Sequence, residues 1–135
     1  MKPLKLTGWV WVLLPALLAW AISGQAADVN AKQTAKLRHV VAFKFKEDAK
    51  KEQIQQLEKA FRDLKKKIPT VASYEWGTNV SQEKRDKGFT HCFILTFKTE
   101  ADRDTYLNHD EHKAFAKMAM DIVADVFVID FWSQK

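Results

Sequence analysis

Residues 37–45 read LRHVVAFKF, and apolar side chains recur at every second position of this stretch. A period of two is typical of a β-strand that buries one face. The shared face holds Leu37, His39, Val41, Phe43 and Phe45. His39 is therefore a polar residue among apolar ones, and the stretch predicts a first strand that carries a candidate site residue.

The period changes immediately after this strand. Residues 49–67 repeat apolar side chains at spacings of three or four, which predicts an amphipathic helix that ends before Pro69. The remaining expected elements are a strand at 71–80 that ends around Gly77, a charged turn at 81–88, a strand at 89–98, a helical region at 100–123 with a break near His109-Asp110, and a strand at 125–132. The order β-α-β-β-α-β predicts an α+β domain of ferredoxin-like topology.

The last strand indicates how the sheet is covered. Residues 125–132 are apolar on both phases, and such a strand needs cover on both sides. Helices cover one face, and a second copy of the same sheet is the economical cover for the other. We therefore expect a homodimer, a dimeric α/β barrel, built from one domain at 37–135.

Composition narrows the classes of partner. The formal net charge is +5, and the basic residues are spread among acidic ones, so we expect no nucleic-acid surface. The chain has one cysteine, Cys92, which leaves no internal disulfide. Burial alone must therefore hold the domain together.

The first 26 residues have the pattern of a signal peptide. Lys2 and Lys5 precede an apolar run at 6–22, and Gly24-Gln25-Ala26 places small residues at the positions that signal peptidase reads. The run falls short of the roughly 20 residues that span a bilayer. We expect cleavage after Ala26, a flexible lead-in at 27–36, and an exported protein, periplasmic or secreted, that is free of the membrane. An uncleaved anchor helix is the alternative.

The chain has four histidines, and the topology suggests that three of them meet. We expect the first and third strands to be adjacent and parallel, which would bring His39 and His91 side by side. The second helix should return His112 to the same level, because a helix rises about 1.5 Å per residue and a strand about 3.3 Å. Tyr106 joins them if the helix breaks, and Phe93 and Phe115 are expected to line the same pocket.

Several polar groups in an apolar cleft are typical of a ligand site. Taken singly, each histidine is more often structural than functional. The pair His109-x-x-His112 could share a metal, but a zinc site needs a third ligand. We therefore expect neither a metal nor a cofactor.

Three segments carry a family resemblance: RHVVAFKF at 38–45, GFTH at 88–91 and YLNHDEHKAF at 106–115. The last is similar to the pattern Tyr-x-x-His-Pro-x-His-x-x-Phe of the stress-responsive α/β-barrel (Dabb) family, with Asp110 in place of proline. From residue 37 to the C-terminus the chain resembles that family. The resemblance implies a dimeric barrel fold.

Within that family the chain looks like a plant polyketide cyclase. The resemblance implies that Tyr106 and His112 are catalytic and that His39 and His91 line the pocket. An imidazole can take a proton near neutral pH, and a phenol can polarise a carbonyl oxygen. We expect the protein to bind, or to convert by cofactor-free acid–base chemistry, a small hydrophobic carbonyl or phenolic compound.

Two alternatives remain open at this stage. The protein could be a non-catalytic, stress-related homodimer whose histidines are structural. It could also be a monooxygenase of the dimeric α+β barrel type, since such enzymes share the barrel architecture.

Overall fold

The computed structural model describes residues 35–134, so the leader, its expected cleavage site and most of the lead-in lie outside the described residues. The elements, in chain order, are β1 (Leu37–Phe45), α2 (Lys51–Lys67), β2 (Ser73–Thr78), β3 (His91–Phe97), α3 (Glu100–Asn108), α4 (Asp110–Ile122) and β4 (Val123–Trp132). None of the helices in this part of the chain has the length and apolar character needed to cross a membrane.

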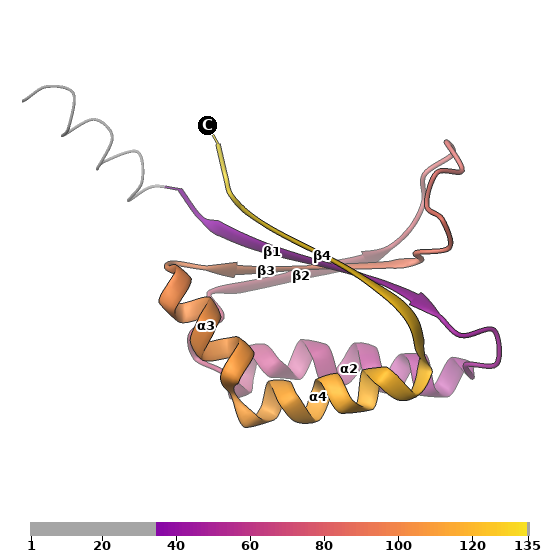
Figure 1. Ribbon diagram of the computed structural model, residues 1–135, viewed down its shortest axis with the longest axis horizontal. Coiled ribbons are helices and arrows are strands. Elements are labelled where there is room, and N and C mark those ends of the chain that lie inside the picture. The colour runs from indigo at the N-terminus through magenta and orange to yellow at the C-terminus, as the bar shows by residue number, and fades with distance from the viewer. Residues whose placement is uncertain (1–34, 135) are drawn as a thin grey trace, which may run out of the picture. The chain divides into compact units, whose positions relative to one another are not determined.

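The four strands form one sheet in the order β2-β3-β1-β4, and every neighbouring pair is antiparallel. The helices lie on one side of this sheet (Figure 1). The predicted ferredoxin-like α+β fold is confirmed. The expectation that β1 and β3 run parallel was wrong, because the α2 crossover makes β1 and β2 parallel. β3 lies between those two strands and must run against both.

The core fills the space between the sheet and the helices. Phe93, Leu95 and Phe97 of β3 are completely buried, as alternation on one face of a central strand requires. Phe61 of α2 contacts Phe93 and also Phe115 of α4, with ring centroids 4.5 Å apart in both pairs. Each such buried side chain stabilises the fold by about 1.5–3 kcal/mol.

The expected helix break is confirmed at His109. This residue has extended backbone angles, and its Nδ1 accepts a hydrogen bond from the Glu111 amide at 3.2 Å, which caps the start of α4. Asp110 and Glu111 follow in the first turn, where negative charge is favourable. Asp110 stands where the pattern Tyr-x-x-His-Pro-x-His-x-x-Phe has proline, and aspartate is also favourable at the start of a helix.

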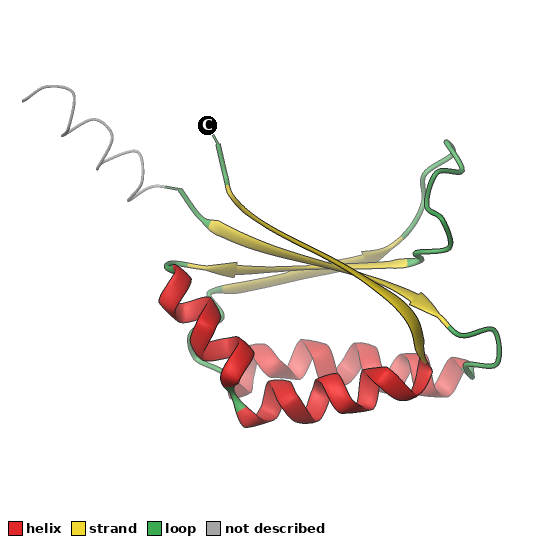
Figure 2. Ribbon diagram, viewed as in Figure 1, coloured by secondary structure: helices red, strands yellow, loops and turns green. Residues whose placement is uncertain are grey.

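The opposite face of the sheet carries no helix within residues 35–134, as Figure 2 shows. Phe127, Ile129 and Phe131 of β4 pair with β1 residues that point to this face, and each is about half exposed. Three large apolar side chains in a row on an open face are unusual for an isolated domain. The residues of β4 that face away from the helices are therefore apolar, and no other part of residues 35–134 covers them.

Candidate functional site

A pocket of about 670 Å³ lies between α4 and the two strands β1 and β4. Its walls are mostly apolar, and the edge strand β4 forms one of them. Among the lining residues, Val126, Val128 and Met120 are 48%, 51% and 75% exposed. The polar side chains that line the pocket are His39, Tyr106, His112, Asp125 and Asp130.

The helix break brings Tyr106 and His112 together. Residues six apart lie on different faces of a continuous helix, but Tyr106 lies in the last turn of α3 and His112 in the first turn of α4. Their ring centroids are 4.5 Å apart. His112 Nδ1 lies 3.1 Å from the Leu107 carbonyl oxygen, which can only accept, so Nδ1 carries the hydrogen. Nε2 is then the ring nitrogen with a free lone pair.

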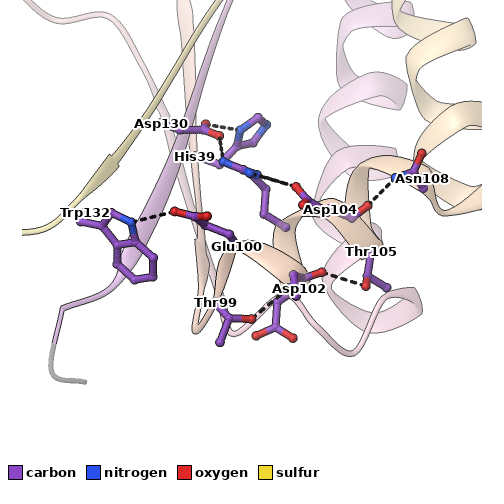
Figure 3. A network of polar contacts seen from close by, with 11 residues as sticks. His39, Thr99, Glu100, Asp102, Asp104, Thr105, Asn108, Asp130 and Trp132 are labelled. Atoms are coloured by element: carbon purple, nitrogen blue, oxygen red, sulfur yellow. Dashed lines mark hydrogen bonds and ion pairs between the residues drawn. The ribbon is translucent and has the colours of Figure 1, made fainter. Parts of the chain in front are cut away.

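His39 meets the same pocket from the sheet. It pairs in register with Asp130 of β4, and its Nδ1 lies 2.6 Å from Asp130 Oδ1. Figure 3 shows this contact. The ring lies edge-on to Tyr106, with centroids 5.9 Å apart, and its side chain is only 6% exposed. Because the carboxylate accepts, the Nδ1 of His39 donates, and in the neutral ring Nε2 is then the acceptor.

Burial sets the protonation of the Tyr106–His112 pair. Burial lowers the pKa of His112, and the hydrogen bond to the Leu107 carbonyl opposes this shift. Burial also raises the pKa of Tyr106. At neutral pH the site therefore holds a neutral imidazole, which can take a proton, beside a protonated phenol, which can donate a hydrogen bond.

The structure brings together four of the six site residues that we predicted from the sequence. His39, Tyr106, His112 and Phe115 line the pocket. His91 and Phe93 do not. Since β3 is antiparallel to β1, His91 lies opposite Phe43 and not beside His39. Phe93 is buried in the core under the sheet, with no exposed surface.

His91 lies near the other end of the sheet, where its ring is mostly buried. Its Nε2 lies 3.0 Å from Glu58 Oε1, and its Nδ1 lies 2.9 Å from Thr90 Oγ1. The ring also packs against Phe45 and Trp76. His91 borders a smaller hollow of about 330 Å³ at the base of the loop between β2 and β3, separate from the larger pocket.

Sequence reasoning missed Asp130. An acidic residue in the apolar strand VADVFVIDFW is a visible signal, but its partner depends on the pairing of β1 with β4. That pairing shifts between Lys44 and Phe45, so counting residues back from the helix does not give it. Within residues 35–134 no three His, Cys, Asp or Glu side chains group in a way that could hold a metal ion.

Comparison with known proteins identifies the family of this chain. Residues 37–133 match the family described as the Stress responsive A/B Barrel Domain, abbreviated Dabb. The chain belongs to the Dabb family. A stress-response A/B barrel domain-containing protein, HS1 of Arabidopsis thaliana, is 32% identical over 70% of this chain and 87% of its own length. Olivetolic acid cyclase of Cannabis sativa is 24% identical over 73% of this chain and 98% of its own.

Solved structures share the Dabb fold of this chain. Hydroxynitrile lyase from Passiflora edulis has a TM-score of 0.70 and 25% identity, covering 74% of this chain and 94% of the lyase. A dimeric ferredoxin-like protein from Thermobifida fusca has a TM-score of 0.65 and 20% identity, covering 75% and 93%. The Dabb relatives of this chain thus include a cyclase and a lyase.

Proposed function

We propose that this Dabb protein binds a small hydrophobic carbonyl or phenolic compound and converts it by acid–base chemistry without a cofactor. One observation carries the proposal: a neutral imidazole, His112, and a protonated phenol, Tyr106, lie with ring centroids 4.5 Å apart at an apolar pocket of about 670 Å³. That volume is in the range of small-molecule sites. The names of two relatives, a cyclase and a lyase, support this class of chemistry.

The residues take distinct roles in this proposal. His112 Nε2 removes a proton from the ligand, because its Nδ1 hydrogen is held by the Leu107 carbonyl. Tyr106 donates its hydroxyl hydrogen to the ligand oxygen on which negative charge develops. His39 orients the ligand through its own Nε2. Phe115 supplies part of the apolar wall.

Binding tests the proposal first. The full chain is titrated with benzaldehyde and with a 5-alkylresorcinol, as a carbonyl and a phenolic probe, and binding is followed by calorimetry and thermal shift. We expect saturable binding of at least one probe that falls about tenfold or more in His112→Ala and Tyr106→Phe. The matched control, His91→Gln, alters a histidine outside the pocket and should bind normally. Equal binding by wild type and His112→Ala would overturn the proposal.

We further propose that a second copy of the chain covers the open face of the sheet. The half-exposed Phe127, Ile129 and Phe131 support this, as does the description of the Thermobifida fusca structure as dimeric. Light scattering of the wild type should give twice the chain mass. Ile129→Lys places a charge in the middle of the apolar row and should give the single-chain mass, whereas Lys98→Glu serves as a surface control. A monomeric wild type would contradict this.

We also propose that the leader is cleaved after Ala26 and that the domain works outside the cytoplasm. N-terminal sequencing of the protein recovered from expressing cells should begin at Ala27. A protein that retains Met1 and sediments with membranes would contradict the proposal and support an anchor.

A further inference from the structure

A chain of three charged or polar side chains joins α3 to the pocket. Arg103 Nη1 lies 3.0 Å from Asp130 Oδ2. Asp130 Oδ1 in turn lies 2.6 Å from His39 Nδ1, a contact that Figure 3 shows. We infer that Arg103 is a positioning residue: acting through Asp130, it holds His39 with Nε2 as an acceptor toward the pocket. The pocket then favours ligands that carry a hydroxyl donor. This inference rests on the proposed function of the same pocket.

The two donors use different oxygens of Asp130, which matters for its orientation. A carboxylate held at one oxygen can rotate, whereas one held at both keeps its plane. Arg103 is itself held, because its Nε and Nη2 lie 3.1 and 2.9 Å from Asp104 Oδ1. The side chains of Arg103 and Asp130 are 23% and 27% exposed, so the link is partly withdrawn from water.

Arg103 also decides how Asp130 meets the imidazole. The guanidinium holds Asp130 at Oδ2, so Oδ1 stays in place to accept a hydrogen bond from Nδ1–H of His39. The other elements around the ring offer Tyr106 from α3 and Phe97 from β3, at centroid distances of 5.9 and 6.4 Å, and His112 beyond Tyr106. No second carboxylate among these neighbours competes for the ring.

This arrangement specifies the ligand class more narrowly than the proposed function does. His39 and His112 both have Nδ1–H engaged by the protein, at Asp130 and at the Leu107 carbonyl, so both can offer an Nε2 lone pair. Tyr106 lies between the two rings and supplies a donor. A matching ligand carries one acceptor oxygen and a hydroxyl donor, as a hydroxylated aromatic aldehyde does.

Long-range ¹H–¹⁵N NMR of the histidine side chains tests the positioning directly, because it separates the two tautomers. We expect His39 of the full-length wild type to carry its hydrogen on Nδ1. Arg103→Gln should give a mixture of tautomers, and Asp130→Asn should do the same by removing the charge that holds both donors. Arg85→Gln, which changes an exposed arginine in the loop between β2 and β3, is the matched control and should leave the spectrum unchanged.

Binding then separates this inference from the proposed function. The probes are 3-hydroxybenzaldehyde and benzaldehyde, which differ by one hydroxyl that cannot reach the aldehyde oxygen of its own molecule. We expect Arg103→Gln to weaken the hydroxylated probe about tenfold and to change the other little. An unchanged His39 tautomer in both Arg103→Gln and Asp130→Asn overturns the inference, even if His112→Ala still abolishes binding. If wild type binds neither probe, the proposed function fails, and the tautomer measurement still decides whether Arg103 positions His39.

Discussion

Two histidine–carboxylate pairs lie at opposite ends of the helix-facing side of the sheet, and only one of them lines the larger pocket. His39 pairs with Asp130 at 2.6 Å, and His91 pairs with Glu58 at 3.0 Å. Both rings are nearly buried, with side chains 6% and 11% exposed. Both pack against aromatic residues. By residue type and burial alone the two ends are equivalent.

The difference lies in the second ring nitrogen. Thr90 Oγ1 occupies the Nδ1 of His91 while Glu58 occupies its Nε2, so that imidazole has both nitrogens engaged. His39 uses Nδ1 for Asp130, and its ring borders the larger pocket with Nε2 to spare. A free lone pair at a cavity, and not a buried histidine as such, distinguishes the candidate site. The following predictions test this contrast, beginning with the largest effect.

Phe93 belongs to the core that supports the His91 end, so its truncation should act on stability. Phe93→Ala removes a fully buried ring packed against Phe61 and should lower the free energy of unfolding by about 3–5 kcal/mol. Urea denaturation measures the change. Phe127→Ala, on the open face of the sheet, is the control. In the background of Ile129→Lys, which should be monomeric, it should lower the free energy of unfolding by clearly less. A loss below about 1 kcal/mol for Phe93→Ala would show that this ring is not part of a packed core.

Substituting His91 and His39 in turn should show that one end of the sheet contributes to stability and the other to binding. His91→Gln leaves Glu58 without its partner and should lower the free energy of unfolding by about 1–3 kcal/mol, with probe binding unchanged. His39→Gln should weaken binding of the hydroxylated probe. Paired denaturation and calorimetry measure both variants. Loss of binding in His91→Gln at a temperature where it is folded would contradict the contrast.

The N-terminal cap of α3 supports only the His39 end. Thr99 Oγ1 accepts a hydrogen bond from the Asp102 amide at 3.1 Å, so Thr99→Ala should cost about 1 kcal/mol. Amide hydrogen exchange should show faster opening of α3, which carries Arg103 and Tyr106, and little change in α2. Thr99→Ser keeps the hydroxyl and should retain protection. Uniform acceleration across the domain would show that the cap has no local role.

The smallest effect is the pH dependence that His112 contributes. Its folded pKa lies below the ordinary value of about 6.5, so between the two values the unfolded chain binds more protons. Stability should therefore rise with pH through this window and be lost as pH falls toward the folded value. Thermal melts of wild type against His112→Gln between about pH 5 and pH 7 measure it. A steeper loss at low pH in the variant than in wild type would contradict the assigned direction.

The fold could be predicted because its signals are local. The alternation at 37–45, the helical period at 49–67 and the break at His109 each depend on residues close in sequence. The proximity of Tyr106 and His112 could also be predicted, because the two residues lie on either side of that break. The partners of His39 and His91 could not be predicted, because we expected β1 and β3 to be parallel. In the antiparallel pair, His91 lies opposite Phe43 and away from His39.

The amino-acid sequence alone determined the element order, the helix break and the apolar character of both sheet faces, because period and capping act over a few residues. Strand direction and register are long-range, and only the tertiary structure decided them. They place Asp130 beside His39 and Arg103 beside Asp130, pair His91 with Glu58, and leave Nε2 of His39 free at the pocket. A shift of one residue in a strand exchanges its faces, so no local pattern could have assigned those contacts.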